Sequence, residues 1–191
     1  MGPDLKYYED MYRSYQAKVQ TEVKPISTGK TGRDLHLIDK ACQNLQVPLV
    51  VVTDDVQLSN NAKVISAKQK CGNAVSHVQM MQYLMDCNIN LIPVDTNRGK
   101  HTLCGLTSLL DAIAIGQPVI MSDNTNISID IEKLKIGFTY KAGDLDDFKA
   151  KLNIFKQNPS LIKEYGDNAR KYAEIHSYKH YCKQLYHIIN G

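Results

Sequence analysis

The sequence predicts an α/β protein, a three-layer Rossmann-like domain in which about six parallel strands carry helices on both faces. Short apolar runs alternate with amphipathic stretches, which is typical of a parallel sheet covered on both sides. The segment P-L-V-V-V-T at 48–53 is almost continuously apolar, as expected for a strand that is buried on both faces. From Asp144 onward only helical patterns follow, so extra helices are expected at the C-terminus.

The expected strands are short and end at polar or glycine-containing loops. They are predicted at 22–28, 48–53, 63–67, 90–94, 118–122 and 138–141. Because parallel crossovers are almost always right-handed, an open, doubly wound sheet is expected. Ligands of such sheets bind at the carboxyl ends of the strands, where three loops of this chain are expected to meet. These loops are 29–33, 68–75 and 95–105.

The expected helices begin at residues that favour helix N-termini. The predicted starts are Asp34, Ser76, Gly105, Asp144 and Pro159, with Gly116 ending the third of these helices. The methionines of the second helix, Met80, Met81 and Met85, are expected to pack in the core. A further short helix is predicted near 129–134. A final amphipathic helix carries Tyr178, Tyr181, Leu185, Ile188 and Ile189, and is expected to pack on the domain or on another domain.

Length and charge exclude some classes of protein. A chain of 191 residues suits one main domain, expected at 21–191 after a linker-like segment or helix at 1–20. The net charge is only +3 and the basic residues are scattered, so no nucleic-acid partner is expected.

Cysteines and the N-terminal segment bear on metal binding and location. The five cysteines are odd in number and widely spaced, which indicates neither a disulfide framework nor a zinc site, so reduced and mostly buried thiols are expected. Residues 1–15 are polar and rich in tyrosine, unlike a signal peptide. The expected location is therefore the cytoplasm, with at most a peripheral association with the membrane.

The loop S-T-G-K-T-G-R-D at 27–34 is the first candidate site. Gly29 and Gly32 allow a tight turn, while Lys30 and Arg33 place two cations at the edge of the sheet. Free N–H groups of the following helix would add positive potential, so a diphosphate fits this loop. The Walker A and G-x-G-x-x-G patterns are both absent. A solvated turn with two surface cations explains the same residues.

The segment C-G-L-T-S-L-L-D at 104–111 is the second candidate site. Gly105, Leu106 and Thr107 begin a helix whose first N–H groups could hold an anion. Asp111 lies about two turns into this helix, on the side of Thr107 and Ser108, and could accept hydrogen bonds from the two hydroxyls of a ribose. A helix carboxylate is more commonly part of a solvated face, so both interpretations stay open on residue types alone.

Four segments in order resemble the C-terminal, donor-binding domain of GT-B glycosyltransferases of the family-4-like, group 1 type. The run G-L-T-S-L-L-D-A-I-A-I-G-Q-P-V-I at 105–120 resembles the donor-site helix, and S-T-G-K-T-G-R-D-L-H-L-I-D-K-A at 27–41 resembles the first loop and helix. L-I-P-V at 91–94 is similar to the strand before the donor loop, and G-F-T-Y-K-A-G-D at 137–144 is similar to a later segment. Together the matches cover about residues 22–175.

The resemblance implies a role for each matching residue. Lys30 and Arg33 would hold the donor diphosphate and stabilise charge on it during transfer, beside Gly29. The amides of 105–107 would meet the distal phosphate, and Asp111 would bind the ribose hydroxyls. The segment 71–78 would pack on the base. No metal and no permanently bound cofactor are implied; the donor substrate is a nucleoside diphosphate sugar.

The chain also departs from the family. A glutamate often stands where this sequence has Leu103, which cannot hydrogen-bond a sugar hydroxyl. The family's N-terminal, acceptor-binding domain has no counterpart here, and residues 1–15 resemble the linker between the two domains. The sequence is thus expected to be one half of a two-domain enzyme, inactive or nearly so without its acceptor domain.

The resemblance therefore implies the donor-binding domain of a glycosyltransferase, a hexosyltransferase. It would transfer sugar from a nucleoside diphosphate sugar, expected to be a UDP-sugar, to a glycan or lipid-linked acceptor. Two alternatives stay open: a nucleotide-sugar epimerase-like domain, for which we find no acid/base pair, and a non-catalytic nucleotide-binding or receiver-like module. Asp54 and Asp55 follow the second strand, whereas a receiver needs its acidic pair after the first.

Overall fold

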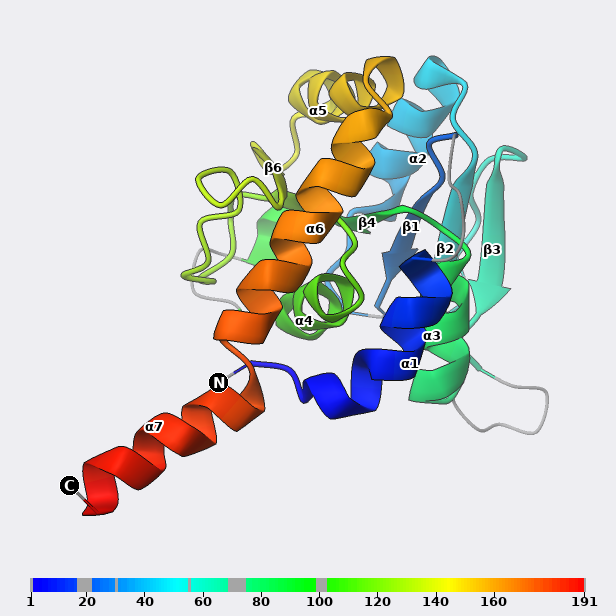
Figure 1. Ribbon diagram of the computed structural model, residues 1–191. Helices are drawn as coiled ribbons and strands as arrows, with labels where there is room; N and C mark the ends of the chain where they lie inside the picture. Colours follow the sequence, from blue (N-terminus) through cyan, green and yellow to red (C-terminus); the bar gives the residue numbers. More distant parts are fainter. Residues whose placement is uncertain are drawn as a thin grey trace.

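A computed structural model describes residues 2–16, 22–29, 31–54, 56–68, 75–98 and 103–190. Six strands form one parallel sheet in the order β3-β2-β1-β4-β5-β6, which confirms the predicted fold class (Figure 1). The strands are β1 (Pro25–Thr28), β2 (Leu49–Thr53), β3 (Ala62–Ser66), β4 (Ile89–Ile92), β5 (Val119–Ser122) and β6 (Gly137–Tyr140). The first strand begins at Pro25, three residues later than predicted.

Helices cover both faces of the sheet. They are α1 (Leu5–Gln16), α2 (Leu35–Leu45), α3 (His77–Met85), α4 (Leu106–Ala114), α5 (Leu145–Gln157), α6 (Ser160–Ile175) and α7 (Tyr178–Asn190), with a 3₁₀ turn η1 (Thr96–Arg98). Helices α2 and α5 pack on one face, while α1, α3, α4 and most of α6 lie on the other. Figure 1 shows α7 projecting away from the rest of the chain, and none of its described residues is buried.

Alternation along the strands divides the core between the two faces. In β2, Leu49 and Val51 face the α2 and α5 side, whereas Val50 and Val52 face α3 and α1. This period of two follows from the opposite directions of successive strand side chains. All five residues of β2 are buried, as the continuous apolar run predicts.

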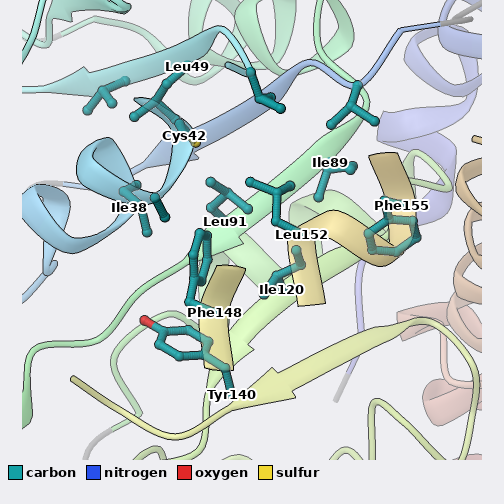
Figure 2. Packing of buried hydrophobic residues seen from close by; sticks show 14 of the residues in the cluster. Ile38, Cys42, Leu49, Ile89, Leu91, Ile120, Tyr140, Phe148, Leu152 and Phe155 are labelled. Atoms are coloured by element: carbon teal, nitrogen blue, oxygen red, sulfur yellow. The ribbon is translucent and has the colours of Figure 1, made fainter. Parts of the chain in front are cut away.

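The core beneath α5 is built around aromatic side chains (Figure 2). Phe148 is fully buried and meets the edge of Tyr140 with ring centroids 5.0 Å apart and planes at 78°. Ile120 of β5 and Leu91 of β4 belong to the same cluster, so α5 packs against the centre of the sheet as well as its edge.

The predicted helix starts are confirmed at three capping residues. Asp34, Ser76 and Asp144 each accept backbone N–H groups of the first turn, and Ser76 forms a full capping box with Gln79. Pro159 is the residue directly before α6 rather than its first helical residue.

The prediction of a short helix near 129–134 is wrong. The segment consists of hydrogen-bonded turns, with Leu134 N–H donating to Asp130 O and Lys135 in the left-handed region at φ 50°. Ile131 is buried because it packs beneath β6 beside Ile136, so the apolar spacing reflects burial rather than helical periodicity.

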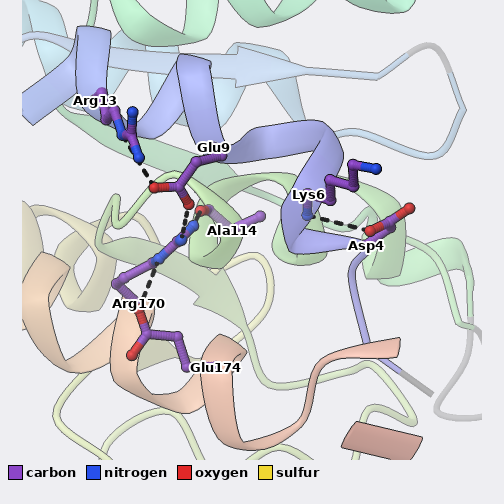
Figure 3. A network of polar contacts seen from close by, with 7 residues as sticks. All are labelled: Asp4, Lys6, Glu9, Arg13, Ala114, Arg170 and Glu174. Carbon is purple, nitrogen blue, oxygen red and sulfur yellow. Dashed lines mark hydrogen bonds and ion pairs between the residues drawn. The ribbon is translucent and has the colours of Figure 1, made fainter. Parts of the chain in front are cut away.

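Arg170 of α6 connects α1 with the end of α4 through polar contacts (Figure 3). Its side chain is 7% exposed and donates to Ala114 O at 2.6 Å, to Glu9 at 2.8 Å and to Glu174 at 3.1 Å. Its guanidinium also lies 4.1 Å from the centre of the Tyr12 ring. The N-terminal segment is therefore an integral part of this face of the domain.

Two further findings concern the cysteines and the membrane. Of the described cysteines, Cys42 and Cys87 are buried, but Cys104 is half-buried and Cys182 is exposed, so the expectation of mostly buried thiols holds only for the first two. No helix within the described ranges is long and apolar enough to cross a membrane.

Truncating the aromatic core should measure how far the fold depends on it. Phe148→Ala is expected to lower the free energy of unfolding by about 3–5 kcal/mol, because it leaves a cavity between α5 and the sheet. Tyr186→Ala on the exposed face of α7 is the control and should change it by less than about 0.5 kcal/mol. Urea unfolding followed by circular dichroism measures both, and equal effects would contradict this description of the core.

Candidate functional site

The candidate site lies where the strand order reverses, between β1 and β4. β1 pairs with β2 on one side and with β4 on the other. The loops that follow β1 and β4 are hydrogen-bonded to each other. Asp34 N–H donates to Pro93 O at 2.8 Å, and Asp95 N–H donates to Gly32 O at 3.0 Å. Arg33 forms an isolated bridge with Val94. The crevice at such a reversal is the usual ligand site of doubly wound sheets.

A cavity of about 340 Å³ opens at this point. Six of the seven predicted site residues line it. Its lining is Thr28, Gly29, Thr31, Arg33, Met80, Leu103, Cys104, Gly105, Leu106, Thr107, Ser108 and Asp111. The structure thus brings together Gly29 and Arg33 from the first candidate segment with all of the candidates from the second.

The seventh predicted site residue, Lys30, lies outside the described residues. His101, the histidine of the predicted loop 95–105, and residues 71–74 of the segment assigned to the base also lie outside them. The remaining residues of that segment, 75–78, include the start of α3.

Arg33 is held in the cavity by neutral atoms only, among the described residues. Its Nη1 donates to Cys104 Sγ at 3.2 Å and to Thr31 O at 3.4 Å, and its Nη2 donates to Ser108 Oγ at 3.3 Å. No ion pair within the described ranges includes Arg33, and its buried Nε has no partner there. A guanidinium without a carboxylate partner favours an anionic ligand.

The N-terminus of α4 meets the same cavity. Gly105 is its N-cap in the left-handed conformation, at φ 97°, and no side chain in the described part of the protein caps this helix. A helix leaves its first N–H groups without intrahelical partners and carries positive potential there. These groups can therefore bind an anion that also contacts Arg33.

Asp111 is buried, so the interpretation that it belongs to a solvated helix face is wrong. It is 2% exposed, and its Oδ1 accepts from the Tyr8 hydroxyl at 2.6 Å and pairs with His77 Nε2 at 3.1 Å. Its Oδ2 has no hydrogen-bond partner among the described residues. Burial and then the hydrogen bond to Asp111 raise the pKa of the Tyr8 hydroxyl, so Tyr8 stays a proton donor.

Sequence reasoning did not identify Tyr8 as part of this site, and it included His77 only as a member of the segment 71–78 that was expected to pack on the base. They come from α1 and α3, and no local pattern pairs them with a carboxylate on α4. Met80 also lines the cavity, whereas Met81 is fully buried in the core, so the prediction that the methionines all pack in the core is wrong for Met80.

Other features of the surface differ from this cavity in chemistry. Two larger hollows, of about 470 and 940 Å³, lie beside α7; apolar side chains predominate in the lining of the first, and charged side chains in the lining of the second. Within the described ranges, no group of three or more His, Cys, Asp or Glu side chains could hold a metal ion.

Gly105 should be intolerant of any side chain. An added Cβ would lie 2.5 Å from Ile92 Cγ2, and the positive φ disfavours L-residues. Gly105→Ala is expected to lower the free energy of unfolding by at least about 2 kcal/mol. Exposed Thr107→Ala, two residues later, should change it by less than about 0.5 kcal/mol. Thermal and urea unfolding measure both; a fully stable Gly105→Ala protein would contradict the tight approach of α4 to β4.

Comparison with known proteins was made by sequence and by structure. No protein-family model and no curated protein sequence matches the chain significantly. The structure is similar to sucrose-phosphate synthase from Thermosynechococcus elongatus, with a TM-score of 0.67, 17% identity and coverage of 98% of this chain and 51% of that chain. It is also similar to HepE from Anabaena, solved in complex with UDP, with a TM-score of 0.63, 14% identity and coverage of 90% and 50%.

A third similar structure contains a single domain. It is the C-terminal domain of LpcC, a glycosyl transferase group 1 protein from Francisella tularensis, with a TM-score of 0.62 and 14% identity. The match covers 89% of this chain and 95% of that domain, whereas the chain spans only about half the length of the first two structures. The chain therefore has the fold of the C-terminal domain of GT-B glycosyltransferases, as the resemblance predicted.

Proposed function

We propose that this chain is the donor-binding domain of a glycosyltransferase and that its switch-point cavity binds a nucleoside diphosphate sugar. One observation carries the proposal: an Arg33 guanidinium without a carboxylate partner and the uncapped N-terminus of α4 face one cavity, among the described residues. Both groups favour the same ligand chemistry, a phosphate anion.

The charge distribution supports a diphosphate at one end of the cavity. Arg33 and the amides of residues 105–107 would contact the phosphates, and Lys30 of the same loop would add a second cation. Fixed cations and helix N–H groups stabilise the charge that develops on a leaving diphosphate without having to reorganise. Contacts accelerate transfer only if they strengthen in the transition state, and the contacts of Arg33, Lys30 and the amides of 105–107 with the diphosphate are the candidates.

The other end of the cavity supports a ribose. Asp111 is one of the lining residues, and its buried Oδ2 lacks a hydrogen-bond partner among the described residues. A carboxylate there accepts hydrogen bonds from vicinal hydroxyls. We assign a UDP-sugar as the donor because HepE, which has this fold, is solved with UDP and with UDP-glucose.

The acceptor belongs to a second part of the enzyme in this proposal. The chain spans about half the length of the similar glycosyltransferase structures. An acceptor-binding domain would complete the cleft and exclude water from it, so this domain alone would bind donor but transfer sugar poorly. The proposed acceptor is a glycan or a lipid-linked sugar.

Calorimetric titration with UDP tests the proposal. The chain is expected to bind UDP, and Arg33→Ala is expected to weaken binding at least about tenfold, because charged hydrogen bonds to phosphate are lost. The double change Lys30→Ala plus Arg33→Ala should weaken it further. The matched control removes two exposed cations away from the cavity, Lys40→Ala plus Lys133→Ala.

The control is expected to leave the affinity for UDP within about twofold, because screened surface charges contribute little. A chain that binds no UDP would remove the proposed function. Binding that the loss of Arg33 and Lys30 does not change would remove these cations from the site.

A further inference from the structure

The Asp111 carboxylate uses only one of its two oxygens within the described protein. Tyr8 and His77 both meet Oδ1, at 2.6 and 3.1 Å, and Oδ2 is buried without a partner there. An unsatisfied buried acceptor is costly, so each one calls for an explanation. Since Asp111 lines the cavity, a ligand that donates a hydrogen bond would satisfy Oδ2.

The two donors fix the direction of the carboxylate. The Tyr8 hydroxyl is a short, charge-assisted donor. His77 Nδ1 lies 2.9 Å from the Tyr7 hydroxyl, and when Nδ1 accepts that hydroxyl, the ring proton is on Nε2 and faces Asp111. With Oδ1 held from two sides, rotation of the carboxylate would break both contacts, so Oδ2 keeps one orientation.

Helix α1 is itself held in place next to this contact. Glu9, directly after Tyr8, pairs with Arg170 at 2.8 Å, and Arg170 also donates to Ala114 O at the end of α4 (Figure 3). Asp111 and Ala114 lie on the same short helix. Arg170 thus connects α1 with the helix that carries the carboxylate.

We propose that Tyr8 and His77 are positioning residues, which hold Asp111 so that its Oδ2 receives the ribose hydroxyls of the donor, and that α1 is thereby part of the nucleotide site. The inference rests on the proposed function but goes beyond it, because it gives Tyr8 and His77 a role in holding Asp111 that neither the resemblance nor the proposed function assigns to them. The aspartate is one methylene shorter than the family's glutamate, so its placement depends more on its neighbours than a longer side chain would.

The test compares UDP with 2′,3′-dideoxy-UDP, which lacks both ribose hydroxyls, by calorimetry on the full chain. Tyr8→Phe removes one hydroxyl and keeps the ring. It should weaken UDP binding about tenfold and change the affinity for the dideoxy nucleotide by less than about twofold. His77→Gln, on a side chain that is 36% exposed, should show the same selectivity for UDP with a smaller loss.

Tyr15→Phe is the matched control. Tyr15 is a second buried tyrosine of α1, 6% exposed, and its hydroxyl lies near Gln117 rather than Asp111. It should weaken binding of the two nucleotides equally or not at all. Thermal unfolding of each variant shows whether a loss of affinity is a loss of folded protein.

The outcomes separate this inference from the proposed function. A wild-type chain that binds neither nucleotide overturns both. A wild-type chain that binds UDP and the dideoxy nucleotide equally, or a Tyr8→Phe protein that loses affinity for both alike or binds UDP more tightly, overturns the positioning role and leaves the diphosphate site intact.

Discussion

The pairing of β1 with β4 is the constraint on which the candidate site depends. Their register places Pro25 beside Ile89 and Ile26 beside Asn90, so the two strands end at the same edge of the sheet. The helix after β1 packs on one face and the helix after β4 on the other. The two connecting loops therefore diverge, and the cavity lies between them, as is usual where the strand order of a doubly wound sheet reverses.

This cavity is lined by groups of opposite charge. Arg33 and the start of α4 supply positive potential, and neutral sulfur and oxygen atoms hold the guanidinium without cancelling its charge. Asp111 supplies a carboxylate, which accepts from Tyr8 and pairs with His77. A ligand with an anionic part next to a diol complements both groups, and a nucleoside diphosphate has that arrangement.

Local signals in the sequence predicted much of the fold and part of the site. Asp34, Ser76 and Asp144 cap their helices because capping needs only a side-chain oxygen and the next turn of backbone. The segment 129–134 was predicted wrongly because the spacing of Ile131 and its neighbours records burial under β6, which turns achieve as well as a helix does. The Tyr8–Asp111 hydrogen bond joins residues 103 positions apart, so no local pattern could indicate it.

The central claim is that a diphosphate binds between the loop after β1 and the start of α4. Titration of ¹⁵N-labelled chain with UDP, followed by amide chemical shifts, tests it most directly. The account predicts that the amides of Arg33 and residues 105–108 shift most and saturate together. Shifts confined to the hollows beside α7, or absent at the start of α4, would contradict it.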